Sequence, residues 1–172
     1  MLEGLRSGPN PPDEVFVVVE IPKGSRNKYE YNKKGYFFLD RVLHSSLTYN
    51  GDYGIIPRTL CPDGDPLDVI VLVDQPSFPG CVMHVRPIGL VKMSDEKGED
   101  DKIVAVLKDD PMYNEVNDIG DLPKHVSREL EYFFKEYKSL ETGKTVSVGG
   151  VFGAEEAKKV ILESIRLYRK KL

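Results

Sequence analysis

Three carboxylates stand within six residues of one another, directly before a strongly apolar segment. They are Asp63, Asp65 and Asp68, in the run CPDGDPLDVIVLV that begins at residue 61. Gly64 and Pro66 restrict the loop between them, so we expect the acids to project together. Hard divalent cations such as Mg²⁺ prefer carboxylate and water oxygens. Because Asp-Gly and Asp-Pro pairs are also ordinary turn residues, the loop by itself predicts either a metal site or an acidic turn.

A second acidic segment, residues 95–101, carries five acids and one lysine and is followed by Lys102. Taken alone, such a run of charges is typical of a solvated loop. If the fold brings it beside the 63–68 loop, like charges crowd together, and bound cations are the natural compensation. The two segments together therefore favour a site for divalent cations.

Cationic and phenolic side chains are distributed in a way that suits an anionic substrate. They include Lys28, Arg41, Tyr53, Tyr137 and Lys138. Singly, each is also explained as a surface or core residue. Several other enzyme classes are disfavoured, because the sequence has no H-E-x-x-H and no G-x-S-x-G motif. A nucleotide P-loop ending at residues 143–145 is excluded, because its first glycine would fall on Lys138.

The composition is that of an ordinary globular chain. It has 172 residues, 40% of them hydrophobic, with 24 Lys and Arg against 28 Asp and Glu. Length predicts one domain, and the weak acidity predicts neither a nucleic-acid nor a membrane partner. With no apolar run near ~20 residues and no apolar leader, we expect a cytoplasmic protein. The charge is unevenly spread: residues 63–68 and 95–101 together carry −7 of a net −4, so the rest carries +3.

The pattern of apolar residues indicates many short strands followed by two helices. Residues 1–14, rich in Gly and Pro, predict an arm before the domain at 15–172. Strands are expected at 15–21, 28–31, 36–43, 53–56, 67–73, 82–92, 103–107 and 144–151. Val126, Leu130, Phe133, Phe134 and Tyr137 share one helical face, with Asp121 as a candidate N-cap, and a second helix is expected from about Ala154 to Lys171. This order predicts an α+β fold, a small barrel or curled sheet with helices packed outside.

Ordered motifs along the chain match one known family. The most specific is Asp63-Gly-Asp-Pro-Leu-Asp-Val69. Around it stand Val-Glu20-Ile-Pro, Lys28-Tyr-Glu30, Asp40-Arg41, Tyr49-x-x-x-Tyr53-Gly, Arg86-Pro-x-Gly, Lys92-Met-x-Asp95, Glu99-Asp100-x-Lys102 and Tyr132-Phe-Phe-x-x-Tyr137-Lys138. From Val15 to the final helix, the sequence resembles the soluble family I inorganic pyrophosphatases of the short bacterial and archaeal type.

The resemblance implies a function and a set of residue roles. It implies Mg²⁺-dependent hydrolysis of pyrophosphate to two orthophosphates by a metal-activated water, without a covalent intermediate; other divalent ions are possible. Asp65 would be the general base and Tyr53 a phenol beside the nucleophile. Several Mg²⁺ ions would be held by Asp63, Asp68, Asp95, Asp100, Glu20 and Glu30. The substrate phosphates would be bound by Lys28, Arg41, Lys102, Tyr137 and Lys138. The implied fold is a five-stranded OB-like β-barrel flanked by two main C-terminal helices, assembled as a homo-oligomer, with a hexamer favoured.

Two departures from the family pattern carry expectations. The family usually carries a Trp after a Gly before the final helix, but Gly149-Gly-Val-Phe-Gly153 has none and the chain has no Trp anywhere. Either Phe152 takes over its packing or a local contact is lost, which would affect subunit stability more than chemistry. Asn50-Gly51 follows Tyr49 in place of the family's proline, which predicts a more flexible link to Tyr53. Two other functions remain open: a non-catalytic, nucleic-acid-binding barrel, and a hydrolase of nucleotides or other phosphoesters.

Overall fold

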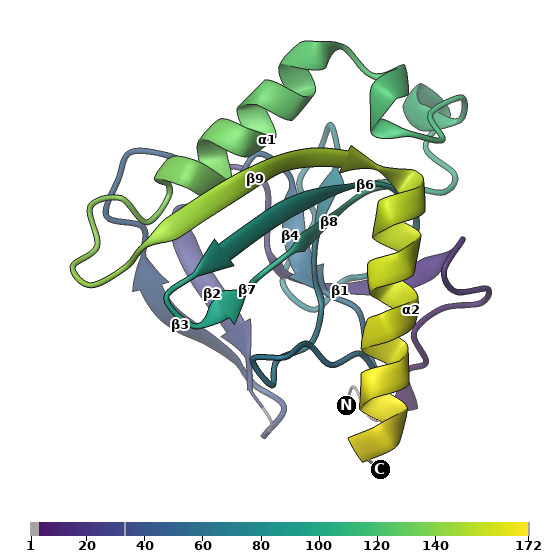
Figure 1. The fold of residues 1–172 in the computed structure, drawn as a ribbon, viewed down its shortest axis with the longest axis horizontal. Helices are drawn as coiled ribbons and strands as arrows, with labels where there is room; N and C mark the ends of the chain where they lie inside the picture. The colour runs from purple at the N-terminus through teal and green to yellow at the C-terminus, as the bar shows by residue number, and fades with distance from the viewer. Residues whose placement is uncertain (1–3, 33, 172) are drawn as a thin grey trace.

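The computed structural model of the chain describes residues 4–32 and 34–171 (Figure 1). Within these ranges the main helices are α1 (Lys124–Glu136) and α2 (Ala154–Lys171). The strands are β1 (Val15–Ile21), β2 (Asn27–Tyr31), β3 (Phe37–Val42), β4 (Asp52–Ile55), β5 (Asp68–Leu72), β6 (Val82–Asp95), β7 (Gly98–Glu99), β8 (Lys102–Leu107) and β9 (Val146–Gly153). Neither α-helix in the described ranges is long and apolar enough to cross a membrane.

Five of the strands close into a ring. They are hydrogen-bonded in the order β1-β4-β5-β8-β6, and β6 pairs again with β1. Four of these pairings are antiparallel, whereas β5 and β8 are parallel. β7 and β9 extend the sheet from β6, and β2 and β3 form a separate hairpin (Figure 1). The expected α+β fold, a five-stranded barrel with two C-terminal helices, is confirmed.

The long strand β6 bends to pair with β1, β7, β8 and β9. Its register shifts between Pro87 and Gly89 and again between Lys92 and Met93, as expected where β-bulges turn a strand. A Cβ atom on Gly89 would lie 2.9 Å from the Phe152 carbonyl oxygen and 3.0 Å from Ile119. Glycine therefore lets β9 approach β6 closely at the bend.

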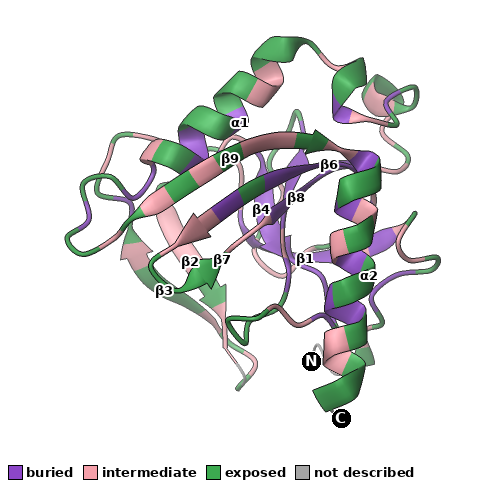
Figure 2. Ribbon diagram, in the orientation of Figure 1, coloured by how far each residue is buried: buried purple, intermediate pink, exposed green. Residues whose placement is uncertain are grey.

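The central strands are buried on both faces. In β5, Ile70 and Leu72 belong to a core that contains the apolar residues of α1, whereas Val69 and Val71 belong to a core that contains those of α2. Successive strand residues point to opposite faces, so the run of Val, Ile and Leu feeds both cores. Burial is concentrated on these strands and on the inward side of α2 (Figure 2).

Most expected elements are present, and their ends differ by a few residues. One prediction is wrong: Asp121 is not the N-cap of the first helix. Its carboxylate accepts hydrogen bonds from the backbone N–H groups of Asn117 and Asp118, 3.0 Å each, and α1 begins after Pro123 without a side-chain cap. Asp118 instead accepts from the backbone N–H of Ala154 at 2.7 Å, where α2 begins. The local turn at 117–121 satisfies its own backbone donors, and this competes with capping of α1.

Residues 4–14 lie against the sheet. The backbone N–H of Phe16 donates to the Ser7 carbonyl oxygen at 2.8 Å, and Ser7 is buried. A Cβ atom on Gly8 would fall 2.4 Å from the Glu14 carbonyl oxygen, so the two backbones are in close contact there. Lys158 on α2 also pairs with Asp13 at 2.9 Å. The described part of the predicted arm is thus tied to both β1 and α2.

Candidate active site

All thirteen residues singled out for a site line one cavity of about 250 Å³. They come from β1 to β6, β8, the loop before β5 and the end of α1. They are Glu20, Lys28, Glu30, Arg41, Tyr53, Asp63, Asp65, Asp68, Asp95, Asp100, Lys102, Tyr137 and Lys138. The fold therefore gathers residues that are up to 118 positions apart in the chain. Their individual roles stay predictions.

At the centre of the cavity, Lys102 lies between two carboxylates. Its Nζ donates to Asp68 Oδ2 at 2.6 Å and to Asp100 Oδ1 at 2.5 Å. The Tyr53 hydroxyl donates to the same Asp68 oxygen at 2.6 Å. This cluster follows from the pairing of the strands, because Asp68 and Lys102 are register partners at the start of the parallel strands β5 and β8. The parallel pairing thus brings the two acidic segments together.

The charge on Lys102 is stabilised despite its burial. Only 2% of the residue is exposed, and burial opposes the charged form, but the carboxylates of Asp68 and Asp100 outweigh this and raise the pKa of Lys102. Burial raises the pKa of Asp100 and the negative charge of Asp68 adds to this, whereas Lys102 opposes it. The cluster therefore depends on the ammonium to hold two acids close together.

An aromatic cluster holds the two phenols of the site. Tyr49 is fully buried, with ring centroids 5.3 Å from Tyr53 and 5.0 Å from Phe133 of α1. Phe133 in turn lies 5.1 Å from Tyr137, which follows α1 directly. Burial raises the pKa of both Tyr53 and Tyr137, so both hydroxyls remain protonated donors at neutral pH.

The loop before β5 presents two exposed acids at the mouth of the cavity. Asp63 Oδ1 accepts from the backbone N–H of Asp65 at 3.0 Å, and the Asp65 carbonyl oxygen accepts from the N–H of Cys61 at 2.8 Å. Gly64 between them adopts φ of +91°, a conformation that favours glycine. Partial burial raises the pKa of Asp65, and the charges of Asp63 and Asp68 add to this.

Glu20 and the β2–β3 hairpin form another wall. Glu20 is 8% exposed, and its Oε1 accepts from the backbone N–H of Tyr31 at 2.8 Å. Burial raises the pKa of Glu20 to about 8, against the lowering effect of that hydrogen bond. Lys28 pairs with Glu30 and lies 3.8 Å from Asp40. The hairpin therefore sets an accessible lysine and an accessible acid opposite the buried acid of β1.

Arg41 has a partner that the sequence analysis missed. Its Nε lies 2.6 Å from Glu141 Oε1, and the Glu141 side chain is only 5% exposed. The second carboxylate oxygen of Glu141 is buried without a hydrogen-bond partner among the described residues. Arg41 also donates to Asp40 at 2.7 Å. No motif marks Glu141, which follows α1 in an irregular segment, so nothing in the sequence could have placed it here.

The end of α1 faces the second acidic segment. Lys138 Nζ lies 3.6 Å from Asp95 Oδ2, and burial lowers the pKa of Lys138. Glu96 and Lys144 pair at 3.2 Å and also line the cavity, as does Lys97. Sequence analysis gave none of these three a role in the site: Glu96 and Lys97 belong to the acidic segment 95–101, and Lys144 begins the expected strand 144–151.

The donor set of the cavity fits hard divalent cations. Eight carboxylates and six Lys or Arg side chains line the cavity, so negative charge is in excess. As the side chains lie, no three Asp, Glu, His or Cys residues within 4–32 and 34–171 form a ready set of ligands. Burial raises the pKa of Glu20, Asp65 and Asp100, and the negative charge of Asp68 adds to this in each case. Oxygen donors that lack counter-charge are the environment that Mg²⁺ prefers.

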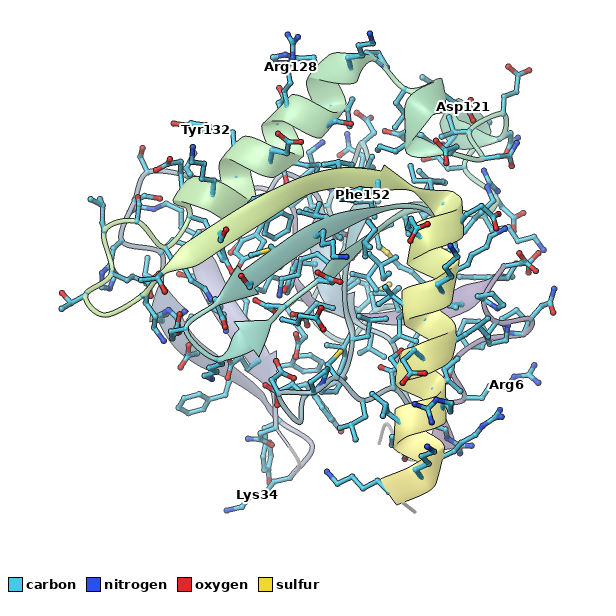
Figure 3. All side chains as sticks on the ribbon, in the orientation of Figure 1. Arg6, Lys34, Asp121, Arg128, Tyr132 and Phe152 are labelled. Atoms are coloured by element: carbon cyan, nitrogen blue, oxygen red, sulfur yellow. The ribbon has the colours of Figure 1, made fainter. Side chains whose placement is uncertain are left out.

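The structure shows where both departures from the family pattern lie. Gly51 is buried, and a Cβ atom there would lie 2.6 Å from the Val71 carbonyl oxygen, so the Asn50-Gly51 link packs closely against β5. Phe152, labelled on β9 in Figure 3, is 41% exposed, so it does not take over a core position. The expected effects on the link to Tyr53 and on subunit stability stay predictions.

Comparison with known proteins settles the family. The sequence profile described as inorganic pyrophosphatase matches residues 17–169. The chain belongs to the inorganic pyrophosphatase family. It is 47% identical to the inorganic pyrophosphatase of Haloferax volcanii over 167 residues, which is 96% of this chain and 94% of the relative. It is 50% identical to that of Sulfolobus acidocaldarius over 165 residues, 94% of this chain and 95% of the relative.

Solved structures agree with the sequence relatives. The crystal structure of the inorganic pyrophosphatase from Thermus thermophilus superposes with a TM-score of 0.94 at 44% identity, over 98% of each chain. The predicted membership of this enzyme family is therefore confirmed by sequence and by fold.

Proposed function

We propose that the chain hydrolyses inorganic pyrophosphate to two orthophosphates in a Mg²⁺-dependent reaction, by direct attack of water. The observation that carries this proposal is the single cavity in which eight carboxylates face six cationic side chains. Pyrophosphate is itself a polyanion, so a cavity with excess carboxylates repels it unless divalent cations bind as well. The same cavity offers lysines and an arginine for the phosphate oxygens.

Metal binding falls to the acids of the cavity. We assign it to Asp63, Asp68, Asp95 and Asp100, with Glu20 and Glu30 as further acids at the site. When bound, several Mg²⁺ ions would neutralise the substrate and lower the pKa of the attacking water. Other divalent ions that accept oxygen ligands fit the same donors.

The remaining residues handle the proton and the phosphates. Asp65 takes the proton of the attacking water, and the raised pKa of its carboxyl makes it a better base than an ordinary Asp. Tyr53 keeps its proton and orients Asp68 through the 2.6 Å hydrogen bond. The positive charges and the Tyr137 hydroxyl bind the oxygens of the substrate and stabilise the charge that develops on the departing phosphate; the binding residues are Lys28, Arg41, Lys102, Tyr137 and Lys138. As the water oxygen bonds to one phosphorus, the bridging P–O bond breaks, and no residue is modified.

Phosphate release from pyrophosphate tests the proposal, with Mg²⁺, Mn²⁺ and Zn²⁺ in separate reactions and ATP as a competing substrate. We expect release with Mg²⁺, abolished by EDTA, and little activity on ATP. No release with any of the three metals would refute it, and faster turnover of ATP would favour the phosphoester hydrolase.

The role of Asp65 has a matched control. Asp65→Asn should lower kcat by about 10²–10⁴-fold while circular dichroism and the melting temperature stay near wild type. Asp109→Asn changes an exposed Asp outside the cavity and should leave kcat unchanged. Equal kcat in the two variants would remove Asp65 from the mechanism.

We also propose a cytoplasmic homo-oligomer, with a hexamer favoured. Large apolar side chains on β3 support an interface, since Phe38 is 62% exposed, Val42 47% and Leu39 46%. Analytical ultracentrifugation should give a mass several times 19.4 kDa. A monomer at micromolar concentration would contradict the assembly.

A further inference from the structure

A second cavity, of about 860 Å³, lies between residues 6–11, the loop after β4 and the C-terminal half of α2. It shares no described lining residue with the candidate active site. Figure 3 shows Arg6 beside the C-terminal part of α2. Its charged lining consists of four arginines, Arg6, Arg58, Arg166 and Arg169.

The described lining residues of this cavity include four arginines and no acid. Arg166 pairs with Glu163 one turn earlier on α2, whereas no carboxylate in the described ranges forms an ion pair with Arg6 or Arg169. A basic residue at the end of a helix is favoured by the helix dipole, which accounts for Arg166 and Arg169. It does not account for Arg6, which reaches the same cavity from the N-terminal segment.

The walls of the cavity are held in place by backbone contacts. Residue 6 precedes Ser7, whose carbonyl oxygen is bonded to the backbone N–H of Phe16. On the opposite wall, the N–H of Leu60 donates to the Ser164 carbonyl oxygen of α2 at 3.0 Å. Arg58 itself adopts φ of +55°, a left-handed conformation that is strained for a residue other than glycine. Such strain persists only where the surroundings impose it.

The cavity also has an apolar wall, formed by α2. It contains Leu162, which is 51% exposed, together with Ile165 and Tyr168. Apolar side chains of this kind offer a surface against which an aromatic ring packs. Arginine groups bind phosphate oxygens through paired N–H donors. The volume is that of a typical small-ligand site.

We propose that this cavity binds a nucleoside diphosphate, with the phosphates on the arginines and the base against the apolar wall of α2. Two phosphates match the clustered guanidinium groups, and a base matches the apolar wall better than a phosphate-only anion does. The site does not depend on the function proposed for the acidic cavity.

Isothermal titration of the full chain with ADP, in EDTA and without pyrophosphate, tests the site. We expect binding with a Kd below about 1 mM, weakened at least tenfold in the double variant Arg6→Gln and Arg169→Gln. Arg128→Gln, an exposed arginine on α1 at the other end of the molecule (Figure 3), serves as the control and should bind ADP as the wild type does. All variants should hydrolyse pyrophosphate at the wild-type rate, which shows that the fold and the acidic cavity are intact.

Two results would overturn the proposal. One is equal ADP affinity in the double variant and the wild type, which would place ADP elsewhere. The other is equal affinity for ADP and methyl diphosphate, which carries the phosphates without a base and should bind at least tenfold more weakly. Leu162→Asp should remove this preference for ADP.

Discussion

The two faces of the central sheet are packed against different helices and do different work. The core between the sheet and α1 contains the aromatic side chains Tyr49, Tyr53, Phe133, Phe134 and Tyr137, and the cluster of Asp68, Asp100 and Lys102 lies at its end. The core between the sheet and α2 is built of Val, Ile, Leu, Ala and Met. Aromatic rings with hydroxyl groups can pack and still present a polar atom, whereas aliphatic side chains only pack. The polar cluster of the candidate active site is thus built on the α1 side, and the α2 side consists mainly of aliphatic packing.

Removal of Lys102 should have the largest effect, because it breaks the polar end of the α1 face. In Lys102→Met, the carboxylates of Asp68 and Asp100 lie close together without the buried ammonium group between them. We expect this to lower the free energy of unfolding by about 3–5 kcal/mol. Activity should fall at least about a hundredfold. Urea denaturation with and without Mg²⁺ measures the first effect, and Mg²⁺ should stabilise this variant more than the wild type. Equal stabilisation of both proteins would argue against metal binding at these acids.

Truncation on the α2 face should separate stability from activity. Ile161 is fully buried, so Ile161→Ala should cost about 2–5 kcal/mol. Its kcat and KM should match the wild type at temperatures where it is folded. On the α1 side, Phe133→Leu should lower the free energy of unfolding in urea less than Ile161→Ala does. It should nevertheless lower activity, because Phe133 packs against Tyr49 and Tyr137. If both variants lost activity equally, the functional difference between the faces would not hold.

Buried acid on the α1 side should make stability depend on pH when metal is absent. The pKa of Glu20 is raised from 4.5 to about 8, so between these values the folded chain keeps a proton that the unfolded chain has lost. Stability from this group is therefore full below pH 4.5 and falls as pH rises toward 8, by roughly 2–4 kcal/mol. Chemical denaturation in EDTA, repeated between pH 4.5 and 8, measures this loss of stability. The free energy of unfolding should fall less with rising pH in Glu20→Gln than in the wild type or in the exposed control Glu131→Gln. A fall of the same size in all three would assign the pH dependence to other groups.

The smallest effect concerns Glu141, which we expect to hold Arg41 in position. Glu141→Gln keeps the shape but removes the charge, so KM should rise about tenfold, equivalent to about 1.4 kcal/mol, with kcat nearly unchanged. Glu131→Gln, exposed on α1, should change neither constant. A purely structural role would instead lower the melting temperature and leave KM as it is.

Sequence reasoning worked where a local pattern decides the structure. The β1 range was predicted without error, because a dense run of Val and Phe ends at Pro22 and Gly24. The family resemblance named thirteen candidate site residues, and all of them line one cavity. Sequence reasoning failed where two local roles compete: Asp121 is used by its own turn and does not cap α1. It also failed where a distant partner decides, because Glu141 meets Arg41 only through the placement of the end of α1 beside the hairpin. No local pattern encodes such a distant contact.

The parallel pairing of β5 with β8 has a consequence for how the chain folds. Antiparallel neighbours can meet through a short turn, but these two strands can pair only after the intervening β6 has crossed the sheet. Asp68 and Lys102 are 34 residues apart, so the entropy of closing a long loop is lost before they meet. In a nascent chain in which β8 has not yet docked, the β2–β3 hairpin and the acidic loop before β5 are present, but Lys102 is not yet in contact with Asp68. We expect the cluster of Asp68, Asp100 and Lys102 to be among the last parts of the molecule to form, so its appearance reports that the whole ring has closed.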